Sequence, residues 1–148
     1  MTRNWNAIPK QTFLVEDGKI GDCWRCCIAA VLGLPAEEVP HFLMKDDGTH
    51  NHNDDADAQR WLNANGYRMV IVTALGGREA IRFPCWNEDR EKFPAPIVIS
   101  VGPTVRSKRR GCYHAVVTQG SDMLYDPHPS EAGLTAITEQ YLIFKPIE

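Results

Sequence analysis

Cys23, His114 and Asp126 are three residue types that cooperate in cysteine-based acyl chemistry. A thiolate is the attacking form of cysteine, so the thiol must be helped to lose its proton. A histidine can take up that proton, and an aspartate can fix the tautomer of the histidine. Because these residues are far apart in the sequence, the interpretation depends on the elements that position them.

Cys23 is predicted to open a buried helix over residues 23–32. Asp22 is of a type that often caps helices, and Gly33 is placed to end this one. The helix contains one charged residue, Arg25, as is typical of a helix packed on most of its circumference. At its start, the helix dipole and the unpaired backbone N–H groups favour a thiolate and an oxyanion. We expect Cys26 and Cys27, about one turn further in, to be buried and inert.

His114 and Asp126 are placed on a predicted hairpin. Strand-like runs at residues 113–118 and 123–125 are joined by a short polar turn. His114 lies near the start of the first run and Asp126 follows the second, so antiparallel pairing brings them side by side. Each residue alone has an ordinary explanation, as a core histidine or as a turn residue before Pro127.

The remaining elements predict an α+β fold. We expect a short strand or an extended entry at residues 11–15, a helical turn at residues 36–39 and a second helix at residues 54–65 with Ala58, Trp61 and Leu62 inside. Further strands are expected at residues 67–73, 97–101 and 141–144. Helices that precede strands favour an antiparallel sheet.

Length and composition indicate one globular domain over residues 1–148. Hydrophobic residues make up 43% and charged residues 24%, which suffices for a core. The net charge of -3 does not favour nucleic acid or membrane surfaces as partners. No apolar run approaches the roughly 20 residues of a membrane span, and the first residues do not form a secretory signal. Five cysteines, three of them clustered, favour a reduced, cytoplasmic compartment.

The order of these residues resembles the papain-like clan of cysteine peptidases. The residues that carry the resemblance are Gln11, the run Gly21-Asp22-Cys23-Trp24, the run His114-Ala115-Val116-Val117 and the pair Asp126-Pro127. They look most similar to the peptidase domains that trim leader peptides from bacteriocins.

The chain also resembles, over most of its length, small uncharacterised proteins of bacteria and phages. The shared motifs are Gly33-Leu34-Pro35, Glu38-Val39-Pro40-His41-Phe42, Gly102-Pro103-Thr104, Asp126-Pro127-His128-Pro129-Ser130 and Gly133-Leu134.

The resemblance implies a papain-like fold in which the buried N-terminal helix packs on an antiparallel sheet. It implies Cys23 as nucleophile, His114 as base, Asp126 as its orienting partner and Gln11 as a side-chain oxyanion donor. The resemblance does not supply a substrate; we expect a peptide or protein substrate and the cytoplasm of a bacterium or a phage-infected host. The chemistry needs no cofactor and no metal.

Four residues are expected to contact the substrate. Trp24 follows the nucleophile, and Thr104 and His128 belong to the shared motifs near Asp126. Arg106 begins a basic run, residues 106–110, which we expect to bind an anionic feature of the substrate or partner. The ordinary alternatives are a rigid turn around His128 and a solvated surface loop at residues 106–110.

Three other interpretations stay open at this point. Cys23 and Cys26 have the spacing of zinc ligands, and the site would be completed from His50, His52, Cys85 and Cys112. The same pair has the spacing of a redox dithiol, although no strand leads into it. The third is a catalytically inactive papain-like module that only binds a partner. The sequence also leaves open whether the scissile bond is a peptide, isopeptide, other amide or thioester, and whether hydrolysis or acyl transfer follows.

Overall fold

The structure is a computed structural model that describes residues 3–73, 95–105 and 113–147. Its helices are α1 (Cys23–Leu32) and α2 (Asp54–Ala64), with 3-10 turns η1 (Trp5–Ala7), η2 (Val15–Asp17) and η3 (Ala36–Glu38). Its strands are β1 (Arg68–Thr73), β2 (Ile97–Gly102), β3 (His114–Gln119), β4 (Asp122–Tyr125) and β5 (Glu139–Phe144). The predicted α+β class is confirmed.

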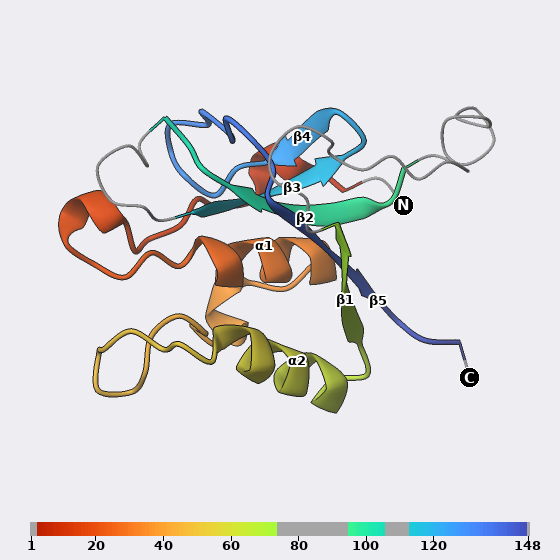
Figure 1. The fold of residues 1–148 in the computed structure, drawn as a ribbon, viewed down its shortest axis with the longest axis horizontal. Coiled ribbons are helices and arrows are strands. Elements are labelled where there is room, and N and C mark those ends of the chain that lie inside the picture. The colour runs from red at the N-terminus through yellow and green to blue at the C-terminus, as the bar shows by residue number, and fades with distance from the viewer. Residues whose placement is uncertain (1–2, 74–94, 106–112, 148) are drawn as a thin grey trace.

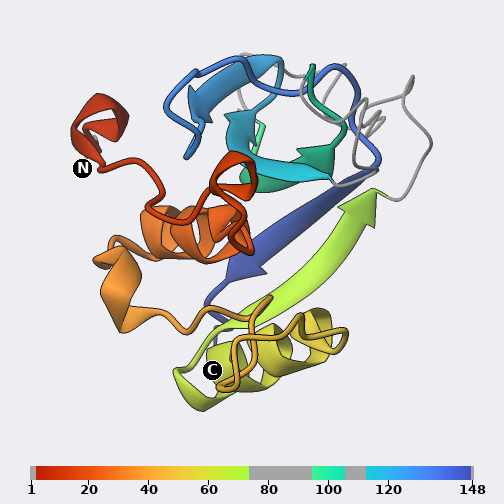
Figure 2. The ribbon, with the colours of Figure 1, turned by 90° about the vertical axis from the view of Figure 1, so that its left-hand side faces the viewer.

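The strands form one antiparallel sheet in the order β1-β5-β2-β3-β4. Helix α1 packs against β2 and β3 while α2 packs against β1, and both helices lie on the same side of the sheet (Figures 1 and 2). The described residues share one buried hydrophobic cluster between these helices and the sheet. That residues 1–148 make a single domain stays a prediction.

The core between α1 and the sheet is built from residues in register on neighbouring strands. Ile99 of β2 pairs with Val117 of β3 on one side and with Tyr141 of β5 on the other. All three belong to the buried cluster, together with Cys27 and Ile28 of α1. Because residues in register point to the same face of a sheet, these strands present a continuous apolar surface to α1.

Helix α1 has the predicted bounds, but its N-terminus differs from the prediction. Asp22 occupies the N-cap position and makes no side-chain capping hydrogen bond. Its carboxylate accepts a hydrogen bond from the backbone N–H of Phe13 and pairs with Arg25 at 2.8 Å instead. The expected role of the Asp22 side chain was therefore wrong. This leaves the first backbone N–H groups of α1 without the cap that the sequence predicted.

The other end of α1 is closed as predicted. Gly33 has φ of 76°, a left-handed conformation that glycine adopts without steric cost. The guanidinium of Arg3 donates hydrogen bonds to the carbonyls of Ala30 and Val31. A cation at the C-terminal end of a helix is stabilised by the helix dipole.

Helix α2 and the β3–β4 hairpin also follow the sequence. Ala58 and Leu62 are fully buried, and Trp61 packs against the core from its edge. Strands β3 and β4 pair from Gln119 and Asp122 up to Val117 and Tyr125, with an irregularity after Val117. None of the helices in the described segments is long and apolar enough to cross a membrane.

Candidate active site

The segment that contains Gln11 joins the start of α1 to the end of the β3–β4 hairpin. The backbone N–H of Gln11 donates to the carbonyl of Pro127 at 2.8 Å. Two residues later, the backbone N–H of Phe13 donates to the carboxylate of Asp22, and the backbone N–H of Asp22 donates to the carbonyl of Phe13. Residues 11–13 thus fix where Cys23 at the start of α1 lies relative to Asp126 at the end of β4.

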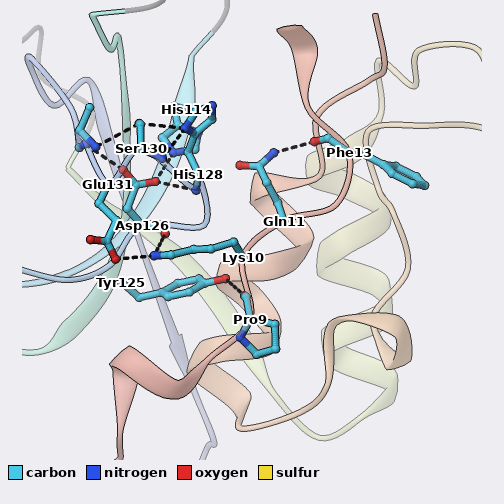
Figure 3. A network of polar contacts seen from close by, with 12 residues as sticks. Pro9, Lys10, Gln11, Phe13, His114, Tyr125, Asp126, His128, Ser130 and Glu131 are labelled. Carbon is cyan, nitrogen blue, oxygen red and sulfur yellow. Dashed lines mark hydrogen bonds and ion pairs between the residues drawn. The ribbon is translucent and has the colours of Figure 1, made fainter. Parts of the chain in front are cut away.

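His114 and Asp126 form the predicted pair. His114 Nε2 lies 2.6 Å from Asp126 Oδ1, and both side chains are buried (Figure 3). His114 is the first residue of β3, and Asp126 follows the last residue of β4. The antiparallel hairpin therefore brings together two residues that are twelve positions apart in the sequence.

The carboxylate of Asp126 is held by two backbone donors as well. The N–H of His128 donates to Oδ1 at 2.9 Å and the N–H of Gly133 donates to Oδ2 at 2.8 Å. Burial by itself raises the pKa of Asp126, but the hydrogen bonds from His114, Gly133 and His128 outweigh it and lower the pKa below its usual value. Asp126 is therefore an anion that these hydrogen bonds fix in position.

Cys23 is a second hydrogen-bond partner of His114. It is the first residue of α1, and only 9% of its surface is exposed. Burial lowers the pKa of His114, while hydrogen bonds with Asp126 and with Cys23 raise it, to about 9 in total. Since Nε2 is bound to Asp126, Nδ1 is the ring nitrogen that remains for Cys23.

Gln11 is buried beside the start of α1. Its Nε2 donates to the carbonyl of Phe13 at 2.7 Å, and Oε1 points to the opposite side (Figure 3). The amide of Gln11 lies beside Gly21, because a Cβ atom on Gly21 would be 3.7 Å from Gln11 Nε2. Gly21 is two residues before Cys23 in the chain. Oε1 is buried without a hydrogen-bond partner among the described residues. The structure thus brings Gln11 to the same site, with one N–H of its amide used by Phe13.

The four residues that the sequence suggested as substrate contacts have different surroundings from one another. Trp24 is 5% exposed and packs edge-on against Tyr141, with 5.0 Å between the ring centroids, so it belongs to the core. Thr104 is buried just beyond β2, two residues after Gly102, which pairs with His114. Arg106 and the basic run at residues 106–110 lie outside the described residues.

His128 lies next to the pair of His114 and Asp126. Its ring meets the ring of His114 edge-on, with 6.1 Å between the centroids. The backbone N–H of Ser130 donates to His128 Nδ1 at 3.0 Å, which makes this nitrogen an acceptor. The turn at residues 127–130 thus fixes the ring of His128 beside His114.

Two residues that the sequence did not single out support this arrangement. Lys10 Nζ donates to the backbone carbonyl of Asp126 at 2.7 Å and pairs with Glu131 at 2.9 Å (Figure 3). The hydroxyl of Tyr125 donates to the carbonyl of Pro9 at 2.7 Å. Both contacts join the N-terminal segment to the hairpin. Their sequence signal is weak, because a Lys and a Tyr have no special spacing relative to their partners.

The residues proposed as zinc ligands are only partly described. The rings of His50 and His52 are tilted by 42° to each other with 4.8 Å between their centroids, while Cys85 and Cys112 lie outside the described residues. Within the described ranges, no group of three or more His, Cys, Asp or Glu side chains could hold a metal ion.

Comparisons with protein-family models, with curated proteins and with solved structures gave no match.

Proposed function

We propose that this protein is a cysteine-nucleophile hydrolase of papain-like architecture that acts on a peptide, isopeptide or related acyl bond. The observation that carries the proposal is the position of His114 between a buried, anionic Asp126 and Cys23 at the first residue of α1. This is the arrangement that a nucleophile, its base and the orienting partner of that base require. The resemblance of the sequence motifs to papain-like peptidases supports it independently.

The raised pKa of His114 provides a cation beside Cys23. At neutral pH, a histidine with a pKa of about 9 is an imidazolium cation. Its charge stabilises a thiolate on the neighbouring Cys23, and the start of α1 adds the positive end of the helix dipole. Asp126 in turn stabilises the imidazolium. The resting site thus has an imidazolium cation between Cys23 and a buried carboxylate.

In acylation, the Cys23 thiolate attacks the acyl carbon of the substrate. The carbonyl oxygen becomes an oxyanion, which the unpaired backbone N–H groups at the start of α1 and the second N–H of the Gln11 amide stabilise. As the tetrahedral intermediate collapses, His114 donates the Nδ1 proton to the leaving group. The acyl group then remains on Cys23 as a thioester.

In deacylation, neutral His114 takes a proton from a water molecule, and the resulting hydroxide attacks the thioester. Collapse of the second tetrahedral intermediate releases the acid and restores the Cys23 thiolate with a protonated His114. An amine in place of this water would turn the same site into an acyl transferase. The proposed substrate is a peptide or protein, and the proposed compartment is the cytoplasm.

The test uses para-nitrophenyl acetate, a chromogenic ester that needs no knowledge of the natural substrate. We expect a rapid release of one equivalent of nitrophenol per protein, together with an acetyl group on Cys23 found by peptide mass spectrometry. Cys23→Ser should abolish this burst. His114→Ala should slow it by about 100-fold or more, and Cys27→Ser is the matched control that should keep the wild-type burst.

Two outcomes would contradict the proposal. One is acetylation that is distributed among lysines or other cysteines while Cys23 stays unmodified. The other is a burst that His114→Ala leaves unchanged in a variant whose circular dichroism is that of the wild type. Either result would favour the inactive binding module.

A further inference from the structure

The three cysteines of α1 have different surroundings. Cys27 is fully buried in the hydrophobic cluster and contributes only to packing. Cys26 is 3% exposed and lines a cavity of about 680 Å³ between the N-terminal segment and α1. Ile8, Thr12, Asp22, Ala30 and Tyr125 also line this cavity. The Cys26 thiol is hydrogen-bonded to the carboxylate of Asp22, and burial together with this carboxylate raises the pKa of Cys26 to about 12, so the resting thiol keeps its proton and loses it only as the S–S bond forms.

We propose that Cys26 is a resolving thiol for Cys23, and that a hydroperoxide converts the pair into a reversible Cys23–Cys26 disulfide. This inference uses the reactivity of Cys23 that the proposed function also requires. It gives the Cys23-x-x-Cys26 spacing a role that the hydrolase mechanism does not use. The disulfide would protect the nucleophile from irreversible oxidation and would switch the site off until it is reduced.

The helix brings the two cysteines within disulfide range. Residues three apart in an α-helix have Cα atoms about 5 Å apart, within the roughly 4.4–6.8 Å that disulfides span. Cys23 lies in the first turn, where its N–H has no intrahelical acceptor. The hydrogen bond from Cys26 N to Asp22 O at 3.0 Å closes that turn. Cys23 can therefore shift toward Cys26 without breaking a hydrogen bond of its own N–H.

The first step consumes the peroxide. The Cys23 thiolate attacks one oxygen of hydrogen peroxide, the O–O bond breaks, and Cys23 becomes a sulfenic acid. The departing hydroxide takes the imidazolium proton of His114 and leaves as water. Sulfur is oxidised by two electrons in this step, and the peroxide is reduced by two.

The second step forms the disulfide. The Cys26 sulfur attacks the sulfur of the sulfenic acid, an S–S bond forms and the S–O bond breaks. The Cys26 proton passes through the Asp22 carboxylate to the departing hydroxide, which leaves as a second water molecule. A dithiol such as dithiothreitol reverses the modification by thiol–disulfide exchange and is itself oxidised.

Arg25 makes this disulfide easy to detect. Trypsin cleaves after Arg25, so the two cysteines fall into separate peptides, residues 20–25 and residues 26–45. We expect one equivalent of hydrogen peroxide, followed by blocking of free thiols and non-reducing digestion, to yield these two peptides joined. Wild type and Cys27→Ser should both give the joined peptides, and Cys26→Ser should not.

In Cys26→Ser, peroxide should convert Cys23 to a sulfinic acid that dithiothreitol does not reverse, while the untreated variant keeps its acetylation burst. The inference is overturned if wild-type Cys23 goes to sulfinic acid without joined peptides. It is also overturned if Cys26→Ser still gives joined peptides, because Cys27 would then be the partner. Both results leave the burst of the untreated protein, and with it the proposed function, unaffected.

Discussion

Asp126 Oδ1 lies 2.6 Å from His114 Nε2, and the carboxylate also accepts hydrogen bonds from the backbone N–H groups of His128 and Gly133. The carboxylate side chain is 0% exposed and the His114 side chain 10% exposed. A hydrogen bond to a fixed, shielded anion is stronger than one to a solvated carboxylate, because little solvent screens the charge. This pairing therefore controls the protonation of His114.

Replacing Asp126 by Asn should lower the pKa of His114 from about 9 to the usual histidine range or below. The amide keeps one acceptor but removes the negative charge, while the burial that lowers the pKa persists. The NH₂ group of the introduced amide is a donor and cannot accept the hydrogen bond that the N–H of Gly133 or His128 gives to the carboxylate. The lost hydrogen bonds should reduce the free energy of unfolding by about 1–3 kcal/mol. NMR titration and urea denaturation measure the two effects. Asp122→Asn, an exposed position of the same hairpin, should change neither quantity.

The raised pKa of His114 predicts that the folded state loses stability at alkaline pH. A group whose pKa is higher in the folded than in the unfolded state stabilises the folded state. The stabilisation is complete at a pH below the pKa of the unfolded state, and it disappears as the pH rises through the pKa of the folded state. A rise from 6.5 to about 9 corresponds to about 3 kcal/mol. We expect the free energy of unfolding, measured by urea denaturation, to fall between pH 6.5 and 9.5. His114→Gln should show a shallower fall, and equal slopes would contradict the raised pKa.

Local sequence patterns were sufficient to predict helix α1 and the β3–β4 hairpin. Helix α1 has the bounds that Gly33 and the apolar run indicated, and the β3–β4 hairpin follows from two apolar runs separated by a polar turn. The pairing of His114 with Asp126 was predictable as well, because a hairpin fixes which residues meet at its open end.

Contacts between distant segments were not predictable from the same patterns. The sequence suggested that Asp22 caps α1, but its side chain bonds to Phe13 and Arg25, which local preferences do not encode. The contact of Lys10 with the carbonyl of Asp126 joins positions 116 residues apart. Such contacts arise from how elements pack, and single-sequence propensities describe only the elements.

Trp24→Phe should reduce stability and leave the chemistry of Cys23 unchanged. Trp24 is buried against Tyr141, and its indole N–H has no hydrogen-bond partner among the described residues. Phe keeps an aromatic contact but leaves a cavity, so the free energy of unfolding should fall by about 1–3 kcal/mol. The rate of Cys23 alkylation by iodoacetamide, mapped by mass spectrometry, should match the wild type. A large rise in the KM for ester substrates at unchanged stability would support the substrate contact that the sequence predicted.

Gly102→Ala should be strongly destabilising, because Gly102 lies against the backbone of another segment. An added Cβ would lie 2.0 Å from the carbonyl oxygen of Ala136 and 3.0 Å from its carbonyl carbon. Backbone cannot move aside as a side chain can, so we expect a loss of about 3 kcal/mol or more in the free energy of unfolding. Because Gly102 pairs with His114, the acetylation burst should also slow.

Gly18→Ala is the matched control for that substitution. Its added Cβ meets nothing within 4 Å, but the backbone has φ of 74°. The Gly18→Ala substitution should therefore lower the free energy of unfolding by only about 1 kcal/mol, the strain of an alanine in the left-handed conformation, and leave the acetylation burst unchanged. Equal losses of stability in the two variants, measured by urea denaturation, would show that segment 133–138 is not packed against Gly102.

Gln11→Ala should separate the two reactions of Cys23. Acetyl transfer from para-nitrophenyl acetate passes through an oxyanion, whereas alkylation by iodoacetamide displaces iodide and forms none. If the Gln11 amide donates its second N–H to the oxyanion, Gln11→Ala should slow the burst by about 100-fold and leave the alkylation rate within about twofold. His114→Ala should slow both reactions, because both use the thiolate. Parallel slowing in Gln11→Ala would mean that the side chain acts by holding the segment before α1 in place, through its hydrogen bond to the carbonyl of Phe13 at 2.7 Å. An unchanged burst would leave the backbone N–H groups of α1 as the oxyanion donors.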